Sequence, residues 1–474
     1  MTGIDALHSL TLGDVLREQR RSYPDREAVV CGEHRFTYPE LDDRVNRLAN
    51  GLTGLGVTEG ERVLWLGQNC HRFLETLLAS AKLGAICCPV NWRNSADEMA
   101  FVIDDSKPSV VIWQNEEIGE RPRSAREKAL HEPHWIQHDN GEFEALLADM
   151  LPIDPEVLVD PAESALMLYT AAFEGTPNGA LLSQTAMLWQ SLVWGATHDF
   201  TYETTYLASE PMFHVAGLMN LIATFHRGGT NVFVRRVNAE RICQLIETER
   251  CTTAYFVDKT INEMTELNKN GRYDLTSLSS PPRNPEWNAM VTLGTSRWDR
   301  QPGGYGQTET MGMLTYHCLA SRPAPGNRSR VVDHNGSELP RGEAGELLVR
   351  GHTTMNNYYD RANLNARRQA GDWHHTNDLA RRETDGSLTW LGSMDRLIKS
   401  GSENVYPAEV EAVIAAHPAV AACEVIGLPD PEWGQAVMAI VTMRPDARVA
   451  EDEILDHCKA RLASYKRPRV IELR

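Results

Sequence analysis

Several features that would place a 474-residue chain outside the soluble globular enzymes are missing from this sequence. It has no run of about 18 apolar residues, the length that crosses a bilayer. Residues 1–12 lack the basic start and the apolar core of a secretory signal. Internal repeats and low-complexity segments are also missing. We therefore expect a cytoplasmic protein without membrane contact, and the length predicts more than one domain.

Basic residues are in short supply. The chain has 47 Lys and Arg against 65 Asp and Glu, which gives a formal net charge of −18 at pH 7. So acidic a surface excludes the basic footprint of proteins that bind nucleic acids or anionic membranes, although a local basic pocket is still compatible with it. The nine cysteines are scattered without a CxxC pair, which is typical of reduced, buried thiols rather than of a disulfide framework.

The apolar residues that are present alternate between helical and strand periods. Residues 41–55 and 73–83 have helical spacing, and residues 62–66, 84–90 and 110–113 are short β-rich runs. This alternation predicts parallel α/β layers. The polar residues 114–161 are weakly patterned, and we expect them to cross the surface.

The second half of the chain predicts further α/β structure and then a change of texture. Residues 165–169 predict a strand that is followed by a loop and a helix over 183–194, and residues 230–234 and 253–257 predict strands. From residue 342 the pattern is short β runs and turns. We expect a three-layered α/β domain with a small β unit over residues 1–395. A small, mobile α/β domain then follows over residues 396–474, with helices at 407–416 and 451–462 and strands at 420–427 and 436–443.

Residues 166–179 carry the first chemical signal. They read Leu-Met-Leu-Tyr-Thr-Ala-Ala-Phe-Glu-Gly-Thr-Pro-Asn-Gly, a strand that leads into a Gly/Pro loop of the kind that cradles phosphate. The segment resembles the phosphate loop of the adenylate-forming acyl-CoA synthetases, the superfamily of acyl-CoA ligases, luciferases and peptide-synthetase adenylation domains. Their loop reads Tyr-Thr-Ser-Gly-Thr-Thr-Gly-x-Pro-Lys-Gly. The match holds at Tyr169, Thr170, Gly175, Pro177 and Gly179.

Other segments resemble the same family in the same order along nearly the whole chain. They are residues 37–41, 84–92, 211–217 (Pro-Met-Phe-His-Val-Ala-Gly), 304–309 (Gly-Tyr-Gly-Gln-Thr-Glu), 375–378, 392–411 and 433–435. The resemblance implies the following site residues: His214 beside the acyl pocket; Tyr305, Gly306, Gln307 and Thr308 around AMP; Glu309 as a Mg²⁺ ligand; Asp378 on the ribose; Asp395 at the hinge between the domains; and Lys399, Gly401, Ser402 and Trp433 along the pantetheine tunnel.

Each of these residues also has a purely structural interpretation. His214 could be a buried, hydrogen-bonded histidine, and Glu309 a remnant of a lost metal site. Lys399 could be a solvated lysine, and Trp433 a core tryptophan. Pocket candidates for the acyl group are His214, Leu218, Tyr255 and Phe256, which suggest an apolar and bulky acid.

The phosphate loop departs from the family at the positions that act on phosphate. Ala171, Ala172 and Phe173 remove hydroxyl donors and backbone freedom. Glu174 brings a carboxylate to the place of the triphosphate, and a like-charge contact at 4 Å costs on the order of 4 kcal/mol at an effective dielectric of about 20. Asn178 replaces the loop lysine.

Departures continue along the chain. The Gly-rich adenine segment does not align with residues 280–298, Asn377 replaces the Gly of Thr-Gly-Asp, and Ser393 replaces an Arg. The family's catalytic lysine is expected after the segment around Lys466, and the sequence ends at Arg474 before that position. Whether a further tail exists stays open.

These losses all affect the formation of acyl-AMP from acid and ATP, whereas the features of CoA transfer are better kept. The sequence therefore predicts an enzyme that converts acyl-AMP and CoA to acyl-CoA and AMP, without ATP or Mg²⁺ and without a metal site. His214, Thr308 and Lys399 are its predicted catalytic residues. A separate enzyme would supply the acyl adenylate, and a specialised, natural-product pathway is expected. Two rivals remain: a complete ATP-dependent synthetase with an unconventional ATP site, and a catalytically silent binding or regulatory subunit. Oligomeric state is open, with a homodimer as one option.

Overall fold

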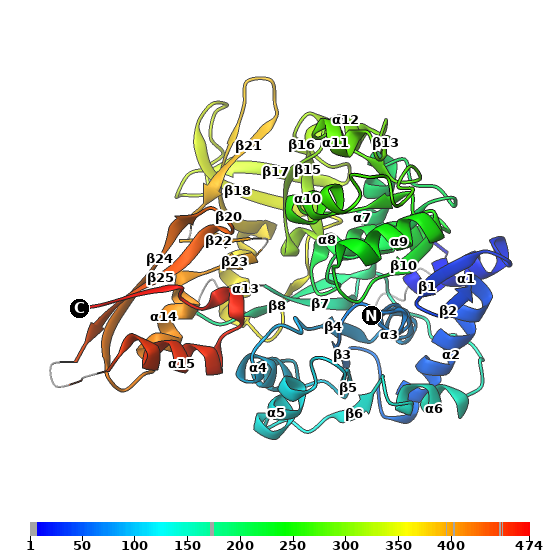
Figure 1. The fold of residues 1–474 in the computed structure, drawn as a ribbon, viewed down its shortest axis with the longest axis horizontal. Coiled ribbons are helices and arrows are strands. Elements are labelled where there is room, and N and C mark those ends of the chain that lie inside the picture. The colour runs from blue at the N-terminus through cyan, green and yellow to red at the C-terminus, as the bar shows by residue number, and fades with distance from the viewer. Residues whose placement is uncertain (1–6, 171–174, 395, 402, 445–446, 448) are drawn as a thin grey trace.

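The structure is a computed structural model that describes residues 7–170, 175–394, 396–401, 403–444, 447 and 449–474. Its N-terminal part contains a seven-stranded sheet in the order β19-β8-β7-β4-β3-β5-β6 (Figure 1). The strands are β3 (Arg62–Leu66), β4 (Ile86–Pro89), β5 (Val110–Trp113), β6 (His134–Gln137), β7 (Ser164–Thr170), β8 (Asn178–Ser183) and β19 (Asn357–Tyr358). The strands from β7 to β6 are parallel, whereas β8 and β19 join in antiparallel register.

A second sheet of five strands has the order β11-β9-β10-β1-β2. It consists of β1 (Glu27–Cys31), β2 (His34–Thr37), β9 (Thr205–Ala208), β10 (Thr230–Phe233) and β11 (Thr253–Ala254). The helices of this part are α1 (Leu12–Ser22), α2 (Tyr38–Gly54), α3 (His71–Leu83), α4 (Ala96–Ser106), α5 (Glu120–Lys128), α6 (Glu142–Ala148), α7 (Gln184–Thr197), α8 (Val215–His226), α9 (Ala239–Glu249) and α10 (Asp258–Leu267). Helix α3 contacts both sheets, so it lies in a layer between them.

Local sequence explains where the helices start and stop. At the start of α2, Thr37 accepts a hydrogen bond from the Glu40 backbone N–H, and the Glu40 carboxylate accepts one from the Thr37 N–H. This capping box satisfies backbone donors that the helix cannot satisfy itself. Helix α3 ends at Gly84, whose φ of 68° is left-handed, a conformation that glycine adopts without steric cost.

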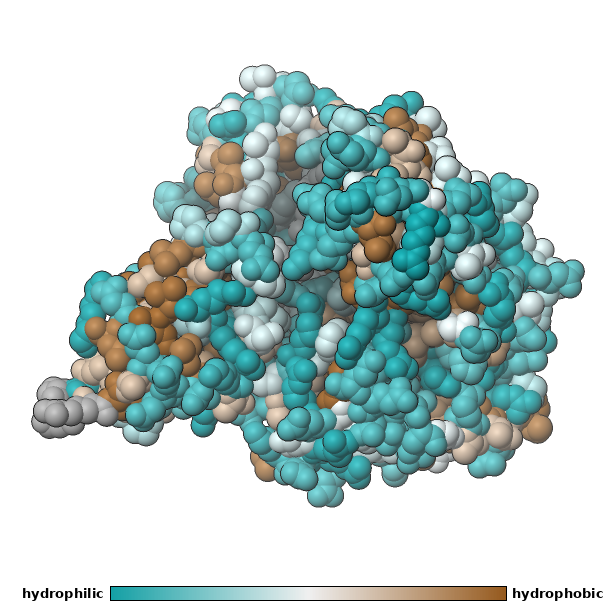
Figure 2. Space-filling model, viewed as in Figure 1, coloured by the Kyte–Doolittle hydropathy of each residue, from teal (hydrophilic) through white to brown (hydrophobic). Residues whose placement is uncertain are grey.

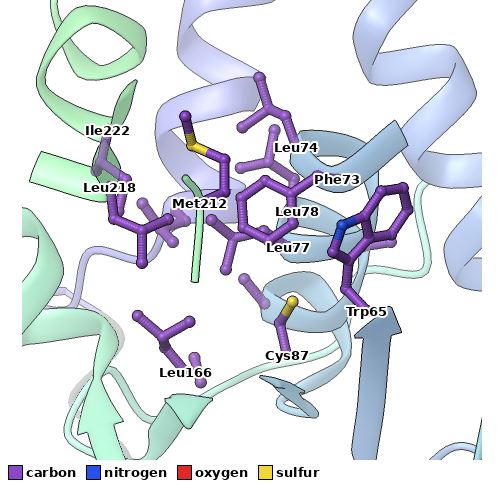
Figure 3. Close-up of a cluster of buried hydrophobic side chains, with 14 of the residues drawn as sticks. Trp65, Phe73, Leu74, Leu77, Leu78, Cys87, Leu166, Met212, Leu218 and Ile222 are labelled. Atoms are coloured by element: carbon purple, nitrogen blue, oxygen red, sulfur yellow. The ribbon is translucent and has the colours of Figure 1, made fainter. Parts of the chain in front are cut away.

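The two sheets and the helices between them share one core. Figure 3 shows part of it, where Phe73 and Leu77 of α3, Leu218 of α8 and Met212 belong to one cluster and Trp65 of β3 packs on Phe73. Met212 has 2% of its surface exposed, and burying a side chain of this size stabilises a fold by about 1.5–3 kcal/mol. Because Met212 is fixed in the core, its neighbours Phe213 and His214 have a fixed position at the surface of this domain.

Smaller β units follow. A three-stranded sheet has β14 (Gly304–Gln307), β15 (Gly312–Tyr316) and β16 (Arg322–Pro323), and a four-stranded sheet has β17 (Asn327–Val332), β18 (Ala344–Gly351), β20 (His374–Arg382) and β21 (Leu388–Ser393). Short elements complete this region: β12 (Ser279–Ser280), β13 (Thr292–Leu293), α11 (Pro285–Asn288), α12 (Arg297–Arg300) and α13 (Ala362–Arg368).

The C-terminal part forms its own sheet and core, at the left in Figure 1. Its strands are β22 (Ile398–Ser400), β23 (Glu403–Val405), β24 (Val420–Asp430), β25 (Gly434–Met443) and β26 (Val470–Leu473), and its helices are α14 (Pro407–Ala415) and α15 (Glu451–Arg461). Figure 2 shows a mostly hydrophilic face, with hydrophobic residues gathered over this C-terminal part. No helix among the described residues is both long and apolar enough to cross a membrane.

The predicted mixed α/β fold with a large first and a small second part is confirmed. Two local predictions are wrong. The segment after β7 returns as strand β8 before α7 begins, so the phosphate loop joins two antiparallel strands rather than a strand and a helix. Residues 114–161 do not simply cross the surface, because they contain α5, β6 and α6, and β6 pairs with β5 through Ile136 in the sheet.

Candidate active site

Two adjoining cavities lie where the N-terminal part meets the C-terminal part. The larger one has a volume of about 1030 Å³ and the smaller one about 300 Å³. Among the described residues, six line both cavities and form the junction: Thr170, Gly304, Gly306, Gln307, Thr308 and Asn404. Residues that the sequence predicts to surround AMP therefore lie between two compartments.

The smaller cavity is built on β14 and β20. The hydroxyl of Tyr305 and the side-chain amide of Gln307 donate to Oδ2 of Asp378, at 2.7 and 2.6 Å. Burial raises the pKa of Asp378 above its usual value, although these hydrogen bonds and the charge of Lys399 oppose the change. The preceding Asn377 has a φ of 57°, a left-handed conformation that asparagine tolerates better than most residues. The predicted ribose carboxylate is thus fixed in the cavity wall despite the loss of glycine.

Aromatic rings form a second wall of the smaller cavity. The rings of Tyr305 and Trp390 are stacked with centroids 6.4 Å apart and planes 24° from parallel. The Lys399 ammonium lies 4.6 Å from the centroid of the Trp390 ring. Trp390, which sequence reasoning missed, thus joins two predicted site residues from β14 and β22. Such a wall suits a planar base, because flat rings stack on aromatic faces.

Glu309 stands at the family's Mg²⁺ position but has a protein partner. Its Oε1 accepts a hydrogen bond of 2.7 Å from the Tyr358 hydroxyl, and burial raises its pKa. In the part of the chain that the structure describes, no group of three or more His, Cys, Asp or Glu side chains is arranged to hold a metal ion. A Mg²⁺ that arrives on phosphates needs only one or two protein carboxylates, and Glu309 would be the group to hold it.

The larger cavity brings His214 to the C-terminal hairpin β22–β23. The Nε2 atom of His214 lies 3.2 Å from Oε1 of Glu403, and the Arg93 guanidinium lies 2.5 Å from the same oxygen. Burial raises the pKa of Glu403, but the hydrogen bond from His214 and the charges of His214 and Arg93 outweigh it and hold the pKa below its usual value. The acyl-pocket segment and the hairpin therefore face each other across the cavity.

Other predicted pocket residues lie elsewhere. Leu218 is fully buried in the shared core on α8, as Figure 3 shows, and Phe256 is buried in a second core behind β9. Neither lines the larger cavity, so these two predictions are wrong: both side chains are fully used in packing. Tyr255, which is 43% exposed, does line it.

Gly401 and Trp433 lie behind the hairpin rather than on a cavity wall. The Gly401 N–H donates to the Trp433 carbonyl at 2.7 Å, and a Cβ on Gly401, whose φ is 64°, would come within 3.2 Å of the Trp433 ring. The guanidinium carbon of Arg469 lies 4.6 Å from the centroid of the Trp433 ring. Trp433 thus packs as a support of the turn. The predicted residues Asp395 and Ser402, and the loop residues 171–174 with Glu174, lie outside the described residues.

The end of the phosphate loop is tied into a network that sequence reasoning missed. Asn178, at the position of the family's loop lysine, is 2% exposed and accepts a hydrogen bond of 3.0 Å from Arg361 Nε. Arg361 also pairs with Asp105 at 2.6 Å, and the Tyr169 hydroxyl donates to Asp105 at 2.7 Å. Asn178 therefore serves the packing of the strand edge instead of facing a ligand.

Lys466 forms ion pairs with both the N-terminal and the C-terminal part of the chain. Its Nζ atom lies 2.7 Å from Glu98 of α4 and 2.6 Å from Glu409 of α14. Burial lowers the pKa of Lys466, but the neighbouring Tyr465, Glu98 and Glu409 hold it well above the usual value. The ammonium is therefore fully engaged by carboxylates and takes a structural role.

The comparisons with known proteins agree with this geometry. The family model described as AMP-binding enzyme matches residues 16–359, and that of the AMP-binding enzyme C-terminal domain matches residues 409–474. The chain belongs to the AMP-binding enzyme family. This is the adenylate-forming superfamily, as the motifs predicted, and the chain is a homologue of its acyl-CoA ligases, which use ATP and CoA and form an AMP-linked intermediate.

Individual relatives and solved structures show which members of the family this chain is similar to. The chain is 32% identical to a feruloyl-CoA synthase of Amycolatopsis sp over 97% of this chain and 94% of that protein. It is 30% identical to an indoleacetate–CoA ligase of Aromatoleum aromaticum, over 94% and 91%. Among structures, it is similar to a double mutant of the o-succinylbenzoate CoA synthetase of Bacillus subtilis bound with a product analogue, with 25% identity, a TM-score of 0.81, and 97% and 94% coverage.

Proposed function

We propose that this AMP-binding enzyme catalyses the second half-reaction of its family on a preformed acyl adenylate. The CoA thiolate attacks the acyl carbonyl, the new C–S bond forms, and the C–O bond to phosphate breaks, which releases acyl-CoA and AMP. A mixed anhydride is already activated, so the protein has mainly to align thiol and carbonyl. Neither ATP nor Mg²⁺ enters this reaction.

The position of Asn178 is the observation that carries the proposal. A loop lysine would bring a cation to the phosphates, but this position holds a buried amide bonded to Arg361. Arg361 is itself paired with Asp105, so it is not a free substitute for that cation. Ala171, Ala172 and Phe173 add no hydroxyl donors, and Glu174 adds a negative charge to the same loop.

The remaining site residues are those that thioester formation needs. Asp378 would hold the ribose hydroxyls, and Tyr305 and Trp390 would contact the base. Thr308 at the junction would donate to the oxygen that becomes negative as the thiol adds. His214 and the hairpin residues Glu403 and Asn404, which line the larger cavity, would flank the thiol, with the part of the chain after residue 395 positioning CoA.

The proposal implies a partner reaction. A separate adenylating enzyme must supply the acyl adenylate, because such anhydrides hydrolyse and do not accumulate. Division of the reaction between two proteins suits a specialised, natural-product pathway more than central metabolism.

A second candidate is the complete ATP-dependent synthetase. The identity to a feruloyl-CoA synthase over nearly the whole chain and the retained Glu309 favour it. A catalytically silent subunit is the third candidate, and nothing in the described geometry favours it over an enzyme.

A two-arm incubation distinguishes the three. One arm holds purified protein, CoA and a panel of acyl adenylates; the other holds the corresponding acids, ATP, Mg²⁺ and CoA. Thioester in the first arm alone is expected. Equal product from the second arm contradicts the proposal, and no product in either arm favours the silent subunit. The Asp378→Asn variant serves as the control that the first arm reports this site.

A further inference from the structure

Glu210 places a carboxyl group on the wall of the larger cavity, four residues before His214. It follows strand β9 and precedes Pro211. Its backbone carbonyl accepts a hydrogen bond of 2.7 Å from the side-chain amide of Asn69, whose Oδ1 accepts one of 3.2 Å from the Met212 N–H. Asn69 and Met212 are both buried, so the backbone that presents Glu210 to the cavity is fixed.

The Glu210 carboxyl has no hydrogen-bond or ion-pair partner among the described residues. No hydrogen bond or salt bridge joins its side chain to another residue in the described parts of the chain, and Arg93 and His214, which interact with Glu210 electrostatically, are both bonded to Glu403. The hydroxyl of Tyr206, which interacts electrostatically with Glu210, is buried and makes no hydrogen bond among the described residues. The partly buried Glu210 carboxylate, an acceptor, and the buried Tyr206 hydroxyl, a donor, thus both lack a hydrogen-bond partner among the described residues.

The electrostatic setting makes this carboxyl sensitive to what enters the cavity. Burial raises the pKa of Glu210 to about 7; Arg93 and His214 oppose that rise and Glu403 adds to it. Tyr206 and Tyr255 are the other titratable groups that interact with Glu210, and burial raises the pKa of both. An entering hydrogen-bond donor would favour the ionised carboxylate, whereas an apolar group would favour the neutral acid.

Besides Arg93, His214 and Glu403, the wall of this cavity has an apolar and aromatic part. It is formed by Phe213, Val215, Met219, Val237, Tyr255 and Val257. A ligand that filled this space with hydrocarbon alone would leave the carboxylate without a partner in a desolvated place, which is costly. A mostly apolar ligand that carries one hydrogen-bond donor would pack on the apolar residues and donate to the Glu210 carboxylate.

We propose that Glu210 selects the acyl group, and that the substrate is a bulky, mostly apolar acid whose body carries a hydroxyl or amino donor that Glu210 accepts. The inference rests on the proposed function, because it takes the larger cavity as the acyl site. Phe213 and Tyr255 favour an aromatic body, since flat rings pack well on aromatic side chains.

Binding of non-reactive acyl sulfamoyl adenosines tests the inference without turnover. The probes are benzoyl and cinnamoyl analogues in matched pairs that differ only in hydroxyl or amino against methyl at each ring position. Calorimetry gives their dissociation constants for the wild type, Glu210→Leu, Glu210→Gln and the exposed control Glu203→Gln. Thermal melting shows that each variant is folded.

We expect at least one donor analogue to bind the wild type about tenfold or more tightly than its methyl partner, the scale of one hydrogen bond to a charged group. That ratio should grow between pH 6 and pH 8 as Glu210 ionises, and fall to within about twofold in Glu210→Leu, while Glu203→Gln keeps it. Wild type that prefers no donor analogue, or a ratio that survives in Glu210→Leu, overturns the inference.

A turnover assay separates this inference from the proposed function. If Glu210→Gln lowers thioester formation equally for every adenylate, Glu210 acts in the chemistry and not in selection, and the inference is overturned. If no adenylate gives thioester although the donor preference in binding is present, the proposed function fails and the role of Glu210 stands.

Discussion

Nε2 of His214 and Oε1 of Glu403 lie 3.2 Å apart, although 189 residues separate them in the sequence. The contact joins the His214 wall of the larger cavity to the hairpin of the C-terminal part. Arg93 binds the same carboxylate, so one buried Glu403 binds an arginine and a histidine of the N-terminal part. This arrangement places the hairpin against the larger cavity, where CoA would meet the acyl group in the proposed function, and it leads to the first predictions.

Replacement of Glu403 should weaken the use of CoA. In Glu403→Gln the hairpin loses its charged bonds to Arg93 and His214, and a hydrogen bond to a charged group contributes about 1.5–3 kcal/mol. We expect kcat/KM for CoA to fall about tenfold, with the affinity for a non-reactive acyl adenylate changed by less than about twofold. Glu424→Gln, on the exposed side of β24, is the control. Unchanged CoA kinetics in Glu403→Gln would contradict this role.

Acid should loosen the contact between the two parts of the chain. The folded structure holds the pKa of Glu403 below its usual value of about 4.5, so its contribution to docking is complete above that pH. As the pH falls through the lowered value, Glu403 takes up a proton and the contribution is lost. Hydrogen exchange of residues 398–405 should stay slow from pH 7 to pH 5 and rise below about pH 4.5. Exchange that is already fast at pH 7 would contradict the contact.

Asp378 should strengthen adenylate binding and lower the stability of the fold at neutral pH. Burial raises the pKa of Asp378, so the folded protein binds its proton more tightly than the unfolded chain, and stability falls as the pH rises toward the raised value. Asp378→Asn should therefore melt at the same or a higher temperature at pH 7, while affinity for a non-reactive acyl adenylate drops about tenfold or more. An unchanged affinity measured by calorimetry would remove Asp378 from the site.

Restoration of the loop lysine should not restore the use of ATP. In Asn178→Lys a cation would be buried beside Arg361, and a buried, unpaired charge destabilises a fold by several kcal/mol. We expect a melting temperature several degrees lower and no acyl-CoA from acid, ATP and CoA. Asn335→Lys, on an exposed turn, should melt like the wild type. ATP-dependent product from Asn178→Lys would show that this one residue had silenced adenylation.

Lys466 should stabilise the contact between the N-terminal and C-terminal parts. Lys466→Met leaves Glu98 and Glu409 buried without their cation, a change that costs about 3–5 kcal/mol when a buried pair is broken. Thermal unfolding should shift down by several degrees, whereas Lys459→Met, which removes an exposed ion pair on α15, should leave it nearly unchanged. Equal melting of the two variants would contradict the structural role of Lys466.

The sequence predicts the parts of this molecule that depend on local pattern. The helix over α3 and the strands β3 and β5 follow from apolar spacing, and the motif from Tyr305 to Thr308 identifies residues that line the smaller cavity. Strand β8 was missed because its first residues, Asn178 and Gly179, are typical of a loop, whereas pairing with β7 decides its structure.

Contacts between distant segments could not be predicted in this way. Arg361 donates a hydrogen bond to Asn178 although 183 residues separate them in the sequence, and neither residue type predicts this pair. Glu210 stands just before a recognised motif, where only the fold shows that a carboxyl enters the cavity. Leu218 and Phe256 were assigned to the pocket by their apolar character, which equally suits the core in which they lie.

Pyrophosphate exchange tests the central claim most directly. Adenylation is reversible, so an enzyme that forms acyl-AMP from acid and ATP carries labelled pyrophosphate into ATP even without CoA. The same preparation is first shown to make acyl-CoA from an acyl adenylate and CoA. The account predicts that it then gives no labelled ATP above the protein-free background with the matching acid, ATP and Mg²⁺. Labelled ATP that forms as fast as the thioester would contradict the account.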